Sequence, residues 1–173
     1  MIVLGLDLSL TGTGMCVVQS NAGDGKGLLA TINTTAKTRT EDRLITIRHT
    51  IAQASSGVDA AIIEGLSYGS VGGAQAERSA LHWMVRVDLY QLGVPYVVVT
   101  PMSLKKFVCG TAKAEKSMMI REVYRRWNVV AANDNEADAA ALAHLGLVYY
   151  GQVEHQTVAQ QEVVFKLKKE QAR

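Results

Sequence analysis

The sequence predicts a single α/β domain built on a five-stranded mixed sheet, with three antiparallel strands followed by parallel strands. The 173 residues are 48% hydrophobic and include only two prolines, which is typical of an ordered globular chain. Three short apolar segments separated by turn residues come first, as in an antiparallel meander. Strand-like and helix-like segments then alternate along the chain, which indicates helices packed on a sheet.

The first strand is expected over residues 2–10, where apolar leucines at even positions alternate with smaller residues and Asp7. This alternation predicts one buried face and one small-residue face that is open for chemistry. A tight turn is expected at 11–14, a second strand at 15–19, a hairpin loop at 21–25 and a third strand at 28–34.

Helical spacing of apolar residues predicts a helix from residue 40 or 41 to 55, with acidic residues in its first turn. The remaining expected elements are a strand at 58–64, a loop at 65–73, a helix at 74–92, a strand at 95–100, and helices at 101–108, 115–127 and 134–150. Residues 1–150 therefore form the expected domain. The polar segment 151–173 is expected to be a tail, for which the sequence leaves open a loose helix, a partner-binding arm or disorder.

Three acidic residues are placed on core elements: Asp7 in the first strand, Glu64 at the end of the fourth, and Asp138 among helical alanines. A buried carboxylate is costly unless it is paired, hydrogen-bonded or bound to metal. A shared divalent cation with oxygen ligands would explain all three. Taken singly, backbone amides of the 11–14 turn would satisfy Asp7 equally well, and an acidic residue closing a strand is common.

Asn135 and Asp138 are three residues apart and so share one helix face, where Asn135 would add a neutral oxygen ligand. Asn133, Asp134 and Glu136 have the spacing of a helix N-terminal capping box, and we assign these three mainly to capping. Asp138 lies beyond the first turn, so capping does not explain it.

Four lysines surround a glycine-containing turn between two helices: Lys105, Lys106, Lys113 and Lys116. Lysine runs usually form a solvated surface. Beside a cluster of carboxylates and metal, however, they would hold the phosphates of a polyanionic substrate.

The ordered set of Asp7, Glu64, the segment 104–116 and Asn135-x-x-Asp138 resembles the RuvC-type Holliday junction resolvases of the RNase H-like superfamily. The resemblance covers residues 2–148, and a bacteriophage-type member of relaxed specificity is a reasonable subclass. It implies an RNase H-like fold with helices on both faces of the sheet. It also implies a structure-selective endodeoxyribonuclease that cuts four-way DNA junctions as a homodimer, by Mg²⁺-dependent phosphodiester hydrolysis in which Mn²⁺ substitutes.

By this resemblance, Asp7, Glu64 and Asp138 are the catalytic, metal-binding carboxylates, Lys116 is catalytic, and Lys105 lies near the scissile phosphate. Asn135 is expected to bind metal, and Lys105, Lys106, Lys113 and Tyr68 to bind DNA. Two departures concern junction selectivity. Asn135 stands where family members often have an acidic residue or histidine, and Tyr68 lies one position beyond the family's aromatic wedge.

Two other functions fit parts of the sequence. A catalytically impaired branched-DNA-binding protein would bind DNA equally with or without Mg²⁺ and never nick it. Residues 6–14 also resemble the phosphate-binding hairpin of actin-like and sugar-kinase ATPases, which would be stabilised by ATP, although 173 residues leave no room for their second domain.

The chain offers no sign of a membrane or export segment, since no apolar stretch approaches 20 residues. Cys16 and Cys109 are expected to be buried free thiols, so a cytoplasmic location is expected. The helix at 74–92 is apolar around much of its circumference, which fits either a dimer surface or ordinary burial.

Overall fold

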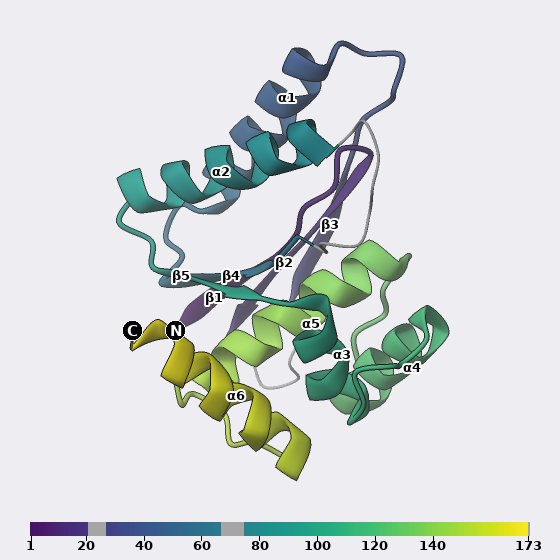
Figure 1. Cartoon of the computed structure of the whole chain (residues 1–173), viewed down its shortest axis with the longest axis vertical. Helices are drawn as coiled ribbons and strands as arrows, with labels where there is room; N and C mark the ends of the chain where they lie inside the picture. The colour runs from purple at the N-terminus through teal and green to yellow at the C-terminus, as the bar shows by residue number, and fades with distance from the viewer. Residues whose placement is uncertain (21–26, 67–74, 173) are drawn as a thin grey trace.

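The computed structural model describes residues 1–20, 27–66 and 75–172, and only the backbone of residue 116. Its centre is a five-stranded sheet of order β3-β2-β1-β4-β5 (Figure 1). The strands are β1 (Ile2–Asp7), β2 (Gly12–Gln19), β3 (Leu28–Asn33), β4 (Ala60–Glu64) and β5 (Tyr96–Val99). Pairing is antiparallel among the first three strands and parallel for β1 with β4 and β4 with β5. The predicted mixed sheet is therefore confirmed.

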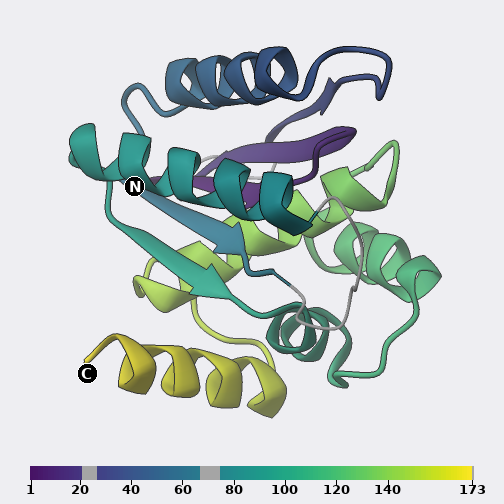
Figure 2. The same ribbon diagram turned by 45° about the horizontal axis from the view of Figure 1, so that its top comes forward.

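Helices cover both faces of this sheet, as Figures 1 and 2 show. The helices α1 (Thr40–Ala54) and α2 (Gln75–Gln91) pack together on one face. The other face carries α3 (Pro101–Cys109), α4 (Lys116–Trp127), α5 (Asp134–Tyr149) and α6 (Val158–Gln171). Among the described residues, no helix is long and apolar enough to cross a membrane.

Alternation along β1 divides the hydrophobic core in two. Leu4, Leu6 and Leu8 belong to the cluster formed with α1 and α2, whereas Val3 belongs to the cluster formed with α3 to α6. Because successive side chains of a strand point to opposite faces, one short strand anchors both layers. Asp7 lies on the same side as Val3, and therefore on the α5 side of the sheet.

The helix α5 lies unusually close to the sheet. A Cβ atom added to Gly5 would be 2.1 Å from the backbone oxygen of Ala139, and one added to Gly14 would be 2.1 Å from that of Asn135. Only glycine leaves room for backbone to approach at this distance. The helix is rich in buried alanines, so small residues on both partners create this contact.

The β1–β2 connection differs from the sequence prediction. The first strand ends at Asp7 rather than at residue 10, and β2 begins at Gly12, so the tight turn expected at 11–14 is wrong. Asp7 pairs with Gly14 across the ladder, and the Thr13 hydroxyl accepts from the Ser9 amide (3.1 Å) and donates to the Ser9 carbonyl (2.6 Å). The turn therefore precedes Gly12. The loop expected at 21–25 and most of that at 65–73 lie outside the described residues.

The C-terminal segment contains α6, which begins after Thr157 with that side chain accepting from the Gln160 amide (3.2 Å). Val163 and Leu167 are buried in the core cluster on the α5 side of the sheet. A salt bridge of 2.6 Å joins Lys106 of α3 to Glu162 of α6. The helix is thus packed against the α/β body.

Candidate active site

A cavity of about 340 Å³ opens where β1 and β4 end, with α2, α3 and α5 forming its walls. Ligands of α/β sheets gather at such strand ends. Four carboxylic residues line this cavity together with an amide and three basic residues: Asp7, Glu64, Asp134, Asp138, Asn135, Lys105, Arg78 and His82.

Strand register and helix packing bring the predicted carboxylates together. Leu6 pairs with Ile63 in the parallel β1–β4 ladder. The next residues, Asp7 and Glu64, therefore lie side by side at the ends of these two neighbouring strands. The close approach of α5 at Gly5 and Gly14 then brings Asp138 to the same cavity. Residues separated by more than 130 positions in the chain thus line one cavity.

Glu64 is the most strongly perturbed group in this cavity. Its pKa is raised to about 9, first by burial and then by the negative charges of Asp7 and Asp138 and a hydrogen bond with Asp7. The positive charge of Lys105 acts in the opposite direction. Without a cation, Glu64 therefore keeps its proton at neutral pH. Carboxyl groups with strongly perturbed pKa values that share a proton in this way are typical of functional sites.

The donor chemistry of the cavity fits a hard divalent cation, because carboxylate and amide oxygens are the ligands that such ions prefer. Asp7, Glu64, Asp138 and the amide oxygen of Asn135 would hold it. Within the described part of the chain, no three His, Cys, Asp or Glu side chains are already arranged as a ligand set. A side-chain hydrogen bond joins Glu64 to Asp7, so a proton lies between these two carboxyl groups. A cation would replace the proton that they share.

The predicted lysines separate into different environments. Lys105 lines the cavity and contributes positive charge at Glu64. Lys106 lies on another side of α3, where it forms the salt bridge with Glu162. Lys113 is exposed and does not line the cavity.

The structure does not describe the side chains of two residues that the sequence predicts to act at the site. Lys116 is the first residue of α4, and only its backbone is described. Tyr68 lies outside the described residues, so its expected contact with DNA stays a prediction.

The N-terminus of α5 is capped largely as expected. The Asn133 side chain accepts from the Glu136 amide (2.9 Å), and the Glu136 carboxylate accepts from the Ala132 amide (2.8 Å). Asp134, which the sequence analysis assigned mainly to capping, also lines the cavity. Its position four residues before Asp138 on the same helix face was the signal for this second role.

Arg78 and His82 line the cavity from α2, and sequence reasoning did not identify them as site residues. His82 is buried, and its pKa is lowered to about 4 by burial and by the charges of Arg86 and Arg78. The imidazole is therefore neutral at pH 7. Because Arg78 and His82 are four residues apart and share one helix face, their spacing was a signal, but nothing in the sequence placed that face toward the acidic residues.

Comparison with known proteins identifies the family and the fold of the chain. The family model for crossover junction endodeoxyribonuclease RuvC matches residues 3–145. Among solved structures, the chain resembles Thermus thermophilus RuvC at 21% identity and a TM-score of 0.71, over 88% of this chain and 98% of that one.

A second structure, T. thermophilus RuvC in complex with Holliday junction substrate, matches at 22% identity and a TM-score of 0.71, over 83% of this chain and 90% of that one. No curated protein sequence matches the chain. The structural similarities establish the fold, and the family match spans most of the sequence and includes all three predicted carboxylates. The chain therefore belongs to the RuvC family of crossover junction endodeoxyribonucleases.

Proposed function

We propose that this protein resolves Holliday junctions by Mg²⁺-dependent hydrolysis of phosphodiester bonds at the cavity formed by Asp7, Glu64 and Asp138. Endonucleolytic cleavage of crossover junctions is the activity of the family to which the chain belongs. The meeting of three carboxyl groups and Lys105 in one cavity at the strand ends supports the assignment of the chemistry to these residues.

Some residues of the cavity would bind the cation, and others would bind the phosphate. A bound divalent cation would supply an activated water nucleophile and would offset negative charge on the phosphate and leaving oxygen. Asp7, Glu64, Asp138 and Asn135 would hold the cation. Lys105 orients the scissile phosphate by its positive charge, and Lys116 is proposed to assist it. The products carry a 5′-phosphate and a 3′-hydroxyl.

Nucleases of this family depend on a divalent metal ion, and we propose Mg²⁺ with Mn²⁺ as a substitute. The proposed ligands are all oxygen atoms, a set that suits Mg²⁺ and Mn²⁺ better than softer metals. The two cysteines are free thiols, which supports a reducing, cytoplasmic setting for the reaction.

The decisive experiment uses Asp7→Asn on a labelled four-way junction in the presence of Mg²⁺. This variant should lose cleavage while it keeps junction binding, because the substitution removes a metal ligand without adding negative charge near DNA. Asp42→Asn, which alters an exposed carboxylate in the first turn of α1, is the matched control and should cleave like the wild type.

Wild-type turnover by Asp7→Asn would refute the assignment of the active site. A wild-type protein that binds the junction equally in Mg²⁺ and in EDTA and never nicks it would instead be an impaired DNA-binding protein. Parallel assays on three-way, flap and linear duplex DNA define the substrate range. The proposed preference is for four-way junctions, and the structure of a relative has been solved with Holliday junction substrate.

We further propose that the protein acts as a homodimer through the outer face of α2. Three apolar side chains form a continuous exposed stripe on that helix: Trp83, Val87 and Tyr90. Their spacing of four and then three residues places them on one face, opposite the buried face of Leu81, Val85 and Leu89. An exposed apolar patch of this kind supports a subunit interface, and two symmetric active sites fit a substrate with two strands to be cut.

A further inference from the structure

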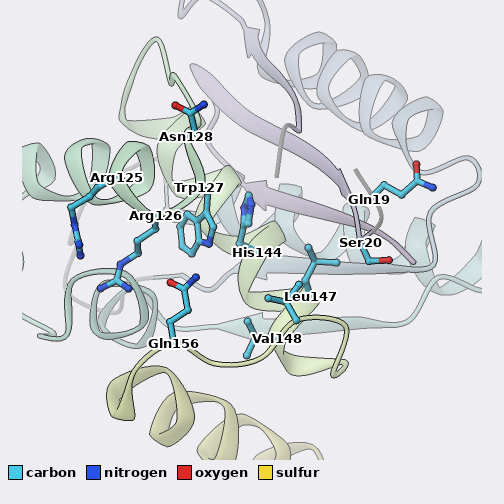
Figure 3. A pocket seen from close by; sticks show the side chains of 11 residues that line it. Gln19, Ser20, Arg125, Arg126, Trp127, Asn128, His144, Leu147, Val148 and Gln156 are labelled. Carbon is cyan, nitrogen blue, oxygen red and sulfur yellow. The ribbon is translucent and has the colours of Figure 1, made fainter. Parts of the chain in front are cut away.

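A second cavity, of about 520 Å³, lies between α4, α5 and the segment that precedes α6 (Figure 3). Among the described residues, the two cavities share no lining residue. Gln19 of β2 lines it and pairs with Ile2, whereas Gly14 of the same strand pairs with Asp7. The second cavity is therefore at the opposite end of β1 from the catalytic carboxylates.

The cationic part of this cavity is Arg126, whose side chain is only 11% exposed. Its Nε atom is buried and has no hydrogen-bond partner among the described residues, and it lies 3.7 Å from the nearest Glu122 oxygen. That carboxylate is already engaged by Arg125, which donates two hydrogen bonds to it (2.9 and 2.6 Å). The charge of Arg126 is thus incompletely balanced, although a buried guanidinium normally requires hydrogen-bonded oxygen partners.

No acidic residue is among the described residues that line the cavity. Arg126 and Arg125 both do so, and Glu122 behind them supplies one negative charge. An excess of positive charge in a partly enclosed space favours an anion.

The rest of the cavity suits a planar, partly polar body. His144 is buried and stacks on Trp127 with 4.4 Å between ring centroids and 19° between planes. Its Nδ1 must carry the proton, because it lies 2.8 Å from the Ala140 carbonyl oxygen, which can only accept. In the neutral ring, Nε2 is then an acceptor.

Side-chain amides and apolar groups complete the lining: Gln19, Asn128 and Gln156 supply the amides, and Leu147, Val148 and Val153 supply the apolar surface. Amide groups both donate and accept, which suits the edge of a heterocycle. The volume falls within the range of about 300–1,000 Å³ that is usual for small-molecule sites.

We propose that this cavity binds a small organic phosphate with a heterocyclic body, of the chemical class of a nucleoside monophosphate. Arg126 holds the phosphate, and the amides with the Trp127–His144 stack hold the heterocycle. The cavity lies between α4 and α5, and both helices also line the active-site cavity, α4 with Met119 and α5 with Asp138. A ligand here is therefore a second, non-substrate ligand of the nuclease.

The test measures binding of AMP to the full chain in EDTA, with adenosine and inorganic phosphate as comparison ligands. Trp83→Phe leaves Trp127 as the sole tryptophan of the two in the sequence, so its fluorescence reports on this cavity, and calorimetry gives the stoichiometry. We expect saturable binding of one AMP per chain, with each comparison ligand at least about tenfold weaker.

Arg126→Gln should weaken AMP binding by about tenfold or more, as expected for the loss of a charged hydrogen-bonding partner. Arg121→Gln is the matched control, since this arginine is on the same helix, is 69% exposed and does not line the cavity. Gln156→Ala removes one amide and should weaken binding of AMP more than of inorganic phosphate. Circular dichroism melting establishes that each variant is folded.

Three results would overturn the proposal. The first is no saturable change with AMP up to millimolar concentration, and the second is an equal loss of binding in Arg121→Gln. The third is loss of AMP binding in Asp7→Asn, or displacement of AMP from the wild type by junction DNA. Either result would place the nucleotide in the active site.

Discussion

The pKa of Glu64 reflects the arrangement of the residues around it. It closes an apolar strand, and the same burial that makes the strand part of the core also raises its pKa. Asp7 and Asp138 reinforce that shift because the fold brings them close. A cation among these groups would stabilise the ionised form of Glu64, so metal binding and proton release should be linked.

In EDTA, the stability of the folded protein should depend on pH through the titration of Glu64. Its pKa is about 9 in the folded protein against 4.5 for the unperturbed group, so the unfolded chain releases this proton first as the pH rises. The contribution of Glu64 to stability is therefore complete below about pH 4.5 and is lost progressively up to about pH 9.

Glu64→Gln removes that titration, and its melting temperature relative to wild type should rise between pH 5 and pH 8.5 in EDTA. Differential scanning fluorimetry measures the difference at each pH. Parallel wild-type and variant curves would contradict the assigned pKa. Mg²⁺ should raise the melting temperature of the wild type more than that of Glu64→Gln.

Adjacent lysines on α3 provide a matched pair for the assignment of the phosphate-binding residue. Lys105 lines the proposed catalytic cavity, whereas Lys106 forms a salt bridge with Glu162 of α6. Lys105→Gln should lower the rate of junction cleavage by about tenfold to a hundredfold, because it removes a positive charge next to the reacting phosphate. Lys106→Gln should change this rate much less. Single-turnover kinetics at saturating protein compare the two, and equal effects would remove the distinction.

Among the elements, the contact between α5 and the sheet has the greatest consequence for function. The helix contributes Asp134, Asn135 and Asp138 to the cavity, and its distance from β1 and β2 is set by backbone contacts at Gly5 and Gly14. These contacts involve main-chain atoms, so a side-chain rotation cannot relieve added volume. The geometry of the carboxylates therefore depends on residues that carry no functional group.

Gly5→Ala should destabilise the protein by about 3 kcal/mol or more, at or above the upper end of overpacking costs. The new Cβ would lie 2.1 Å from the Ala139 oxygen and 2.6 Å from the Ala143 nitrogen. The folded fraction should also lose cleavage, because α5 must move away from Asp7. Urea denaturation and the junction assay measure the two effects.

Gly57→Ala is the control for a loss of backbone freedom without a steric clash. Gly57 has a φ of +76° and open space around its added Cβ, so this variant should cost only about 1–2 kcal/mol and should keep its cleavage activity. A Gly5→Ala protein that is as stable and active as Gly57→Ala would show that α5 is not constrained at this contact.

At the scale of the whole molecule, the two faces of the sheet have different roles. The face covered by α3 to α6 meets the proposed catalytic cavity through α5, whereas α1 and α2 cover the other face and leave the outer side of α2 exposed. Arg86 lies over the Trp83 ring at 5.2 Å, so the proposed dimer surface combines apolar area with a cation. The helix α2 also lines the proposed active-site cavity with Arg78 and His82.

Val87→Asp should convert the proposed dimer to a monomer, because it places an unpaired charge in the centre of the apolar stripe. Light scattering after size-exclusion chromatography measures the mass. On a four-way junction, the variant should make single nicks but few paired cuts. Phe165→Asp on α6, where Phe165 is 70% exposed, is the matched control and should keep both the dimer and paired cutting. A monomeric wild type would contradict the proposed interface.

The sequence by itself determined the order and type of the elements up to residue 150, and it identified three of the four acidic residues that line the cavity. Alternation around Asp7, the apolar run that ends at Glu64 and the alanine-rich segment around Asp138 each specify burial locally, so hydrophobic periodicity was sufficient. The glycines at 12 and 14 were misread as a turn, since glycine supports both a turn and a close backbone approach. Only α5 packed against β2 distinguishes the two.

The tertiary structure alone decided which charged residues share an environment. Lys105 and Lys106 are adjacent in the sequence, yet Lys105 lines the proposed catalytic cavity and Lys106 forms a salt bridge with α6. Asp134, Arg78 and His82 join the site because α5 and α2 approach it from opposite sides of the sheet. Periodicity defines the faces of a helix, but the partner of each face follows from three-dimensional packing, and the pKa of a carboxyl group follows from that partner.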